Sequence, residues 1–220
     1  MNFTQIAVEI AAGIPISLAT SLSGIAAGSI LAAPLALGRL SRHRWPRAAS
    51  WIHVQTIRSI PMIALLFLIY FGLSQFPAVR QSFLWPVLRE PLWCAILALA
   101  LKTSAYFCEV YRIGIMAVPP DEIEAARAFG YSGLRLYRHI IVPYGVRVVL
   151  PALSSEFVVM VKASSLASLV TLMDITGIAA SIASQTYRPI AAFSVAAIYY
   201  LAFNALGIAG FRLLERRLAT

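Results

Sequence analysis

Long apolar runs dominate this chain, and one polar stretch interrupts them near the middle. A membrane-spanning helix needs about 20 mostly apolar residues. Five segments reach that length, over 15–37, 53–73, 92–113, 145–169 and 190–211. Hydrophobic residues make up 60% of the chain and charged residues 12%, which excludes an ordinary soluble domain. The pattern therefore predicts an all-α membrane protein with five transmembrane helices.

The polar stretch runs from Pro119 to Pro143, between the third and fourth apolar segments. Asp121 followed by Glu124 has the form of a capping box, in which an N-cap side chain and an acid three residues later satisfy amides at a helix start. We therefore expect Asp121 to begin a short amphipathic helix that presents an apolar stripe.

A second short helix is expected after that one. Gly130 can end the first helix in a left-handed conformation, Ser132 can cap the second, and Pro143 is expected to close it. Two short helices joined at a glycine, next to the membrane, form a surface that another protein can bind.

Basic residues indicate the orientation, because cytoplasmic loops carry an excess of Lys and Arg. On one side lie Arg39, Arg42, Arg44, Arg47, Arg112, Arg127, Arg135, Arg138, Arg147, Arg212, Arg216 and Arg217, and on the other lie Arg80, Arg89 and Arg188. This distribution predicts a periplasmic N-terminus, a cytoplasmic C-terminus and a cytoplasmic polar loop. The net charge of +9 is spread along membrane flanks, so we expect contact with membrane lipid headgroups and no nucleic acid partner.

The chain lacks the motifs of a nucleotide-binding enzyme. No G-x-x-x-x-G-K-[ST] stretch occurs, and neither Lys102 nor Lys162 follows a glycine-rich loop. Cys94 and Cys108 fall on one predicted helix, too far apart to form a disulfide, so we interpret both as buried apolar residues. We expect no enzymatic activity, no metal site and no cofactor in this chain.

The polar loop resembles the EAA loop of ABC importer membrane subunits. The resemblance rests on Glu124-Ala125-Ala126, on Gly130, and on Ile141-Val142-Pro143. In that family the loop is the coupling helix that seats in a groove of the ATPase subunit. The resemblance therefore implies that Glu124, Ala125, Ala126, Gly130 and Pro143 couple this chain to an ATPase.

Other stretches resemble polar amino acid permeases of the histidine/glutamine type, which have five spans and the type I importer fold. They are Arg58-Ser59-Ile60-Pro61, Ala105-Tyr106 with Glu109 and Arg112-Ile113-Gly114-Ile115, Glu156-Phe157 with Lys162, Ser165 and Leu166, Thr186-Tyr187-Arg188-Pro189, and Leu214-Glu215-Arg216-Arg217-Leu218. The chain departs from the family pattern at Gln55, Ser59, Ile60 and Ala163, the last standing where an aspartate is common.

The resemblance implies a four-part transporter in the bacterial inner membrane. Two permease subunits, homologous or identical, would form the path. A homodimeric cytoplasmic ABC ATPase would bind ATP and Mg, and a periplasmic substrate-binding protein would deliver polar, possibly basic, amino acids. The alternative cargo is an opine or another small organic cation. A gradient-driven carrier or a membrane scaffold are further alternatives, but a carrier should show inverted repeats and a scaffold would not need the loop motif.

Ionisable residues inside spans need a partner, water or a function. Glu156 falls near the middle of the fourth span, where it can pair with Lys102 of the third span or contact cargo. We also assign Ser59 and Ser164 to the substrate pathway. Position 163 is seven residues after Glu156 and lies on the same helix face. Because the resemblance implies an aspartate there, Ala163 removes a second acid that a dibasic cargo would use.

Three further charges have structural explanations. Glu109 and Arg112 are three residues apart and are expected to pair on one helix face. Arg58 is expected to snorkel at the inner mouth of the second span, with a gate role as the alternative. Asp174 is assigned to the outer loop, where it would be solvated or meet the delivery protein.

Overall fold

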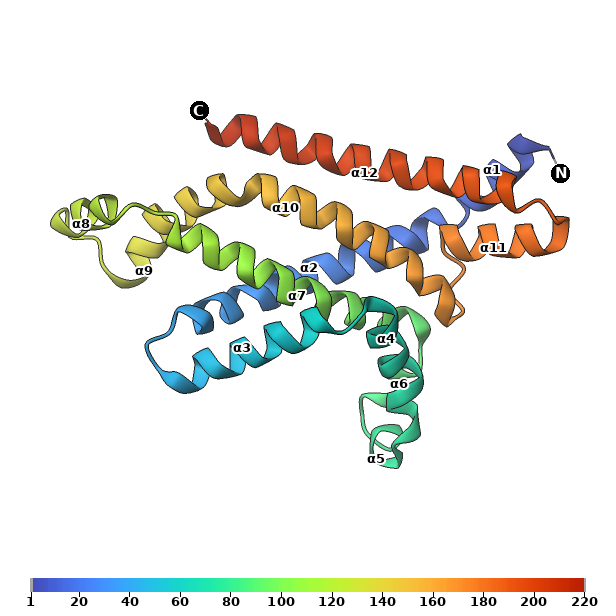
Figure 1. Ribbon diagram of the computed structural model, residues 1–220, viewed down its shortest axis with the longest axis horizontal. Helices are drawn as coiled ribbons and strands as arrows, with labels where there is room; N and C mark the ends of the chain where they lie inside the picture. Colours follow the sequence, from blue (N-terminus) through green and yellow to red (C-terminus); the bar gives the residue numbers. More distant parts are fainter. Residues whose placement is uncertain (1, 220) are drawn as a thin grey trace.

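The computed structural model describes residues 2–219, and every regular element within them is helical (Figure 1). The long helices are α2 (Ile14–Leu40), α3 (Arg44–Ser59), α7 (Pro91–Met116), α10 (Val142–Ser164) and α12 (Pro189–Ala219). The shorter ones are α1 (Phe3–Ala11), α4 (Met62–Phe67), η1 (Leu68–Gly72), η2 (Leu73–Gln75), α5 (Pro77–Arg80), α6 (Trp85–Leu88), α8 (Pro120–Ala128), α9 (Gly133–Leu136), η3 (Tyr137–Ile141), η4 (Ser165–Val170) and α11 (Ile175–Thr186).

Helix α7 is the centre of the bundle. It packs against α2, α10, α3 and α4, and 61% of its most apolar window is buried, against 22% for α12. Small residues of α7 such as Ala98 and Ala105 are fully enclosed, which lets neighbouring helices approach closely. The exposed leucines and isoleucines of α12 therefore form a lipid-compatible outer face rather than a core.

Among the residues that the structure describes, four helical segments are long and apolar enough to cross a membrane: Ile14–Leu40, Pro91–Met116, Gly133–Val170 and Pro189–Leu218. They contain the predicted segments 15–37, 92–113, 145–169 and 190–211. The predicted segment 53–73 differs, because it is not one helix. Two helical pieces, Arg44–Ser59 and Met62–Gln75, meet there at a bend of 106° and count as a fifth span only if taken together.

The bend has a local cause. Pro61 has no amide hydrogen and restricts the residue before it to extended conformations. Ile60 accordingly has φ −78° and ψ 126°, and α4 begins only at Met62. Beyond the bend, α4, α5 and α6 turn away from the long helices (Figure 1).

The two ends of the bundle carry different elements. Helices α8 and α9 lie at one end, toward which α12 brings the C-terminus, and α1 and α11 lie at the other (Figure 1). Ile6 and Ile10 of α1 share a hydrophobic core with Ile175 and Ile182 of α11 and with the start of α12. The polar loop and the N-terminus therefore lie at opposite ends.

Asp174 lies in the loop that follows the fourth span, but the prediction that it is solvated is wrong. Asp174 is 1% exposed and is the N-cap of α11, where its Oδ1 accepts a hydrogen bond of 2.7 Å from the Gly177 amide. Its Oδ2 accepts a bond of 3.2 Å from the Tyr200 hydroxyl. Burial raises the pKa of this carboxyl, and the bonds from Gly177 and Tyr200 partly offset that effect. Asp174 thus joins α11 to α12.

Candidate functional site

The polar loop folds as two short helices over a small core of its own. Ala126 of α8 is buried and packs with Val118, Leu136 and Ile141. Glu124 and Ala125, on the other side of α8, are exposed. The loop thus buries the side of α8 that carries Ala126 and leaves Glu124 and Ala125 accessible to a partner.

The first loop helix begins earlier than the capping-box prediction placed it. Pro119 is the N-cap of α8, no capping box forms, and Asp121 and Glu122 lie in the first helical turn. Acidic side chains there still favour the helix, since its N-terminus carries a partial positive charge. The prediction that Asp121 is the N-cap is therefore wrong, although the helix itself lies within the predicted loop.

The glycine turn is confirmed. Gly130 has φ +85°, and the amide of Tyr131 donates to the carbonyl of Ala126 over 3.0 Å. This six-to-one bond after a left-handed residue is the Schellman termination of a helix. A shallow concavity of about 440 Å³ follows, lined by Arg127, Gly130, Tyr131, Ser132, Gly133, Leu136 and Tyr137.

Pro143 does not close the second loop helix. Ser132 precedes α9 as expected but makes no side-chain cap bond. Helix α9 continues through one π-helical turn, η3, into α10, and Pro143 stands in the first turn of α10. The π-helical turn just before Pro143 lets a continuous helix accommodate a proline, because local π-helical adjustment satisfies backbone groups that the proline leaves without partners.

Apolar side chains on the loop are exposed. Phe129, which directly follows α8, is 84% exposed, and Leu134 of α9 is 82% exposed. The sequence prediction identified the motif residues of the loop but not these two exposed side chains.

Charged residues lie on three helices of the bundle, Arg58 at the end of α3, Lys102 on α7 and Glu156 on α10. The guanidinium of Arg58 lies over the ring of Tyr106, 5.0 Å from its centroid. Lys102 Nζ is 5.7 Å from the same centroid. Arg58 is exposed and makes a cation–π contact with Tyr106 of α7.

The predicted pair of Glu156 with Lys102 does not form. Lys102 Nζ instead donates to the backbone carbonyls of Ile57, Arg58 and Ile60. Glu156 Oε2 is buried and makes no hydrogen bond. A buried carboxylate oxygen without a partner is costly.

The two serines assigned to the pathway bond to their own helices. Ser59 is exposed, and its hydroxyl donates to the carbonyl of Gln55 over 2.8 Å. Ser164 is buried, and its hydroxyl donates to the carbonyl of Val161 over 2.8 Å. Such bonds leave the lone pairs of each hydroxyl free.

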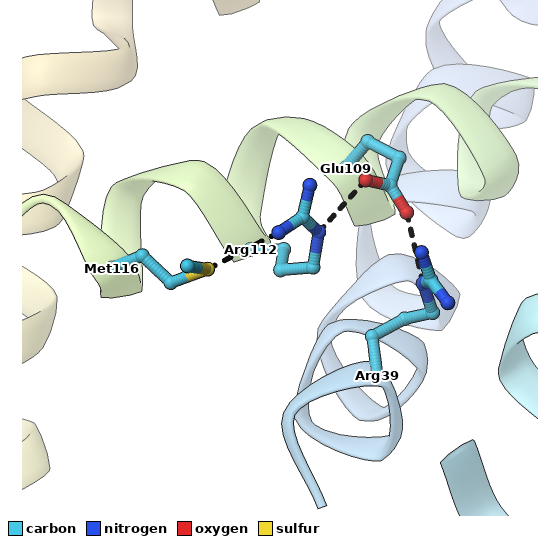
Figure 2. A network of polar contacts seen from close by, with 4 residues as sticks. All are labelled: Arg39, Glu109, Arg112 and Met116. Atoms are coloured by element: carbon cyan, nitrogen blue, oxygen red, sulfur yellow. Dashed lines mark hydrogen bonds and ion pairs between the residues drawn. The ribbon is translucent and has the colours of Figure 1, made fainter.

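Glu109 and Arg112 pair as predicted, and a third residue joins them (Figure 2). Glu109 accepts hydrogen bonds from Arg112 Nε at 2.8 Å and from Arg39 Nε, at the end of α2, at 3.0 Å. Arg112 also reaches the sulfur of Met116. Sequence spacing identified the partner within α7, whereas Arg39 is 70 residues away in the chain and no local pattern indicated it.

Within the described part of the chain, the side chains form no metal site. Within 2–219, no three His, Cys, Asp or Glu residues are placed to hold a metal ion. Cys94 and Cys108 are buried free thiols, in agreement with their interpretation as apolar residues.

The chain matches known transport proteins over nearly its whole length. Residues 24–220 match the family model described as binding-protein-dependent transport system inner membrane component. Over 208 residues the chain is 47% identical to the octopine transport system permease protein OccM of Rhizobium meliloti, covering 94% of this chain and 85% of OccM. It is 38% identical to the histidine/lysine/arginine/ornithine transport system permease protein HisM of Salmonella typhimurium, covering 93% and 88%.

A solved structure has the same fold. A crystal structure of an amino acid ABC transporter matches with a TM-score of 0.84 and 29% identity, over 99% of both chains. The similarity therefore extends over the broken second span and the loop as well as the long helices.

Proposed function

Because this chain belongs to the family of binding-protein-dependent transport system inner membrane components, we propose that it is the membrane subunit of an ABC importer for polar amino acids, including basic ones. The observation that carries the proposal is the exposed EAA-type loop, with its left-handed Gly130, at one end of the bundle. Relatives named for amino acid and opine transport support the same class of cargo.

The loop is the proposed contact with a cytoplasmic ATPase. Glu124 and Ala125 face outward, and Phe129 and Leu134 offer apolar anchors beside the concavity at Gly130. A buried aromatic anchor surrounded by polar groups is the usual composition of a strong protein contact. In this arrangement ATP and Mg belong to an ATPase homodimer, and the loop end of the bundle, with the C-terminus, is cytoplasmic.

The remaining partners follow from the same proposal. A second permease subunit, homologous or identical, would cover part of the exposed apolar surface, and lipid would cover the rest. A periplasmic substrate-binding protein would deliver cargo at the opposite end, near α1 and α11. The assembly would lie in the bacterial inner membrane.

The cargo path is proposed to pass between Arg58 and Glu156. A carboxylate in a low dielectric attracts an ammonium or guanidinium far more strongly than in water, and Glu156 Oε2 has no competing hydrogen bond. Arg58, from α3, is the matching positive group for a cargo carboxylate. An α-amino acid carries both charges.

An opine is the second candidate cargo, supported by the identity of 47% with an octopine permease protein. Both cargo classes can carry a carboxylate and a cation, so the charges of the site fit either. Competition between an amino acid and an opine for uptake distinguishes the two cargo classes.

Reconstitution tests the function. The chain is co-purified with candidate ATPase and binding-protein subunits, placed in proteoliposomes, and assayed with labelled arginine, histidine and octopine. We expect ATP-dependent uptake of one of these cargoes, which requires the binding protein, and no ATP hydrolysis by the isolated chain. Uptake without ATP, or hydrolysis by this polypeptide alone, would contradict the proposal.

A further inference from the structure

The C-terminal end of α3 is held by a single side chain of another helix. Lys102 of α7 is 6% exposed, and its ammonium donates to the carbonyls of Ile57 at 2.7 Å, Arg58 at 3.3 Å and Ile60. An ammonium has three hydrogens, so all three donors are used on this one turn. No donor remains for an acidic partner.

These carbonyls need an external donor because of the break at Pro61. In an α-helix the amide of residue 61 would donate to the carbonyl of Ile57, but a proline has no amide hydrogen. The helix ends with the bond from the Ile60 amide to the Thr56 carbonyl, which leaves the following carbonyls without helical partners. In hydrocarbon no water replaces them, and Lys102 supplies three bonds at that point.

Two neighbouring contacts hold the same stretch of α3 against α7. His53 Nε2 and the hydroxyl of Ser104 are 2.9 Å apart, and Arg58 lies over the ring of Tyr106. The exposed side chain of Arg58 thus lies against α7, and its backbone carbonyl accepts a hydrogen bond from Lys102.

We infer that Lys102 is a positioning residue for translocation, which caps the broken end of α3 and thereby holds the backbone that carries Arg58. Its role in transport rests on the proposed function, whereas its role as a cap does not. The 106° bend is then a built feature of the path, set by Pro61 and stabilised by a lysine from the central helix. Cargo would contact Arg58 and Glu156, and Lys102 would act through the backbone.

The alternative role for Lys102 is that of counter-ion to Glu156. It makes a different prediction for a double variant. If Lys102 balanced the charge of Glu156, removing both charges would restore the amide exchange and the transport that are altered when only Lys102 is replaced. If Lys102 caps carbonyl groups, Glu156→Gln cannot restore them.

Hydrogen–deuterium exchange on the assembled transporter in lipid nanodiscs measures the cap directly. The variants are Lys102→Met, which has no donors, Lys102→Arg, which keeps charge and donors, and Lys102→Met with Glu156→Gln. Lys162→Met is the matched control, since Lys162 is the other lysine of the chain and is exposed. In Lys102→Met we expect amides of 55–66 to exchange about fivefold faster or more, because an uncapped helix end frays.

Transport is then measured with the same variants as cargo molecules moved per ATP hydrolysed. We expect Lys102→Met to lower this ratio by about fivefold or more, Lys102→Arg to restore both ratio and exchange, and the double variant to remain as frayed as Lys102→Met. Lys162→Met should match the parent in both assays. If Lys102→Met does not accumulate in the membrane, Lys102→Gln, which keeps two donors, replaces it.

Three results would overturn the inference. They are unchanged exchange over 55–66 in the variant lacking donors, failure of Lys102→Arg to restore either readout, and recovery of the parent exchange rate in the double variant. Absence of uptake by the parent complex would instead contradict the proposed function, and the exchange measurement would still decide whether Lys102 is a cap.

Discussion

Gly114 of α7 and Gly145 of α10 touch through their backbones. A Cβ atom added to Gly145 would stand 2.8 Å from the carbonyl oxygen of Gly114, and one added to Gly114 would stand 3.0 Å from that of Gly145. Only glycine permits helices to cross so closely. This crossing lies where the two helices that flank the loop leave the bundle, and it therefore fixes the base of the loop.

Gly145→Val should destabilise the folded subunit by about 1–3 kcal/mol, the usual cost of forcing extra atoms into a packed contact. The measurement is the thermal midpoint of the detergent-purified complex, together with membrane abundance. Gly210→Val is the control, because nothing lies within 4 Å of a Cβ at Gly210 and both changes alter helix propensity in the same way. Equal midpoints for the two variants would show that the crossing is not tight.

Glu109→Ala should cost about 3 kcal/mol, since it removes two hydrogen bonds between charged groups that contribute about 1.5–3 kcal/mol each and are partly exposed. It also leaves Arg39 and Arg112 without their shared acid (Figure 2). Glu90→Ala removes an exposed ion pair with Arg89 and should cost less than about 1 kcal/mol. Chemical unfolding of both variants checks the difference, and a similar loss for the two would argue against the network.

Asp174→Ala should destabilise the protein by about 1 kcal/mol or more, because a lost N-cap costs about 0.5–2 kcal/mol and Tyr200 loses its acceptor. Asp174→Asn keeps an oxygen toward Gly177 and should retain most of the stability. Thermal melts of the two variants test this order, and the reverse order would contradict it.

Asp174 should also give the stability a pH dependence. Its folded pKa is raised above the ordinary value of 3.8 by burial, so folding favours the protonated form. The stabilisation from this group is complete below 3.8 and is lost as the pH rises through the higher folded pKa. Asp174→Asn should remove that part of the pH dependence, and identical pH profiles for the two proteins would refute it.

Gly130→Val should uncouple ATP hydrolysis from uptake while leaving membrane insertion intact. The left-handed conformation at Gly130 costs a branched residue about 1–2 kcal/mol, and no neighbour lies within 4 Å, so the effect comes from the backbone alone. Gly130→Asn, which tolerates this conformation, should stay coupled. Gly130→Asp and Glu124→Lys should uncouple through charge, and wild-type uptake per ATP in proteoliposomes would refute the loop's role.

Glu156→Gln should reduce uptake of cationic cargo about tenfold or more, since a hydrogen bond to a charged group contributes about 1.5–3 kcal/mol. Membrane abundance and basal ATP hydrolysis should remain near normal, because no protein donor loses a partner at the buried oxygen. Labelled arginine uptake and immunoblotting, run side by side, make the test. Normal uptake at normal abundance would remove Glu156 from the path.

Features set by neighbouring residues were predictable from the sequence. Gly130 has the positive φ that its place after a short helix suggested, and Glu109 meets Arg112 at the spacing of one helical turn. The long apolar runs likewise matched four of the spanning segments in the structure. In each case the determining interaction lies within a few residues of the chain.

Features set by distant residues were not predictable in the same way. The break at Pro61 was hidden inside an apolar run long enough to span a membrane, and its cap comes from Lys102, more than forty residues away in the chain. Asp174 lies in a short polar gap that resembles a solvated loop, yet Tyr200 and the core of α11 enclose it. Pro143 failed to stop a helix because α9 had already started the helix that α10 continues.

The continuous helix from Gly133 to Val170 gives the loop two unlike arms. On one side, Ala117 to Pro119 form a non-helical joint between α7 and α8. On the other, α9, η3, α10 and η4 form one continuous helical stretch of 38 residues. A displacement of the loop would therefore be transmitted more directly to α10, which carries Glu156, than to α7.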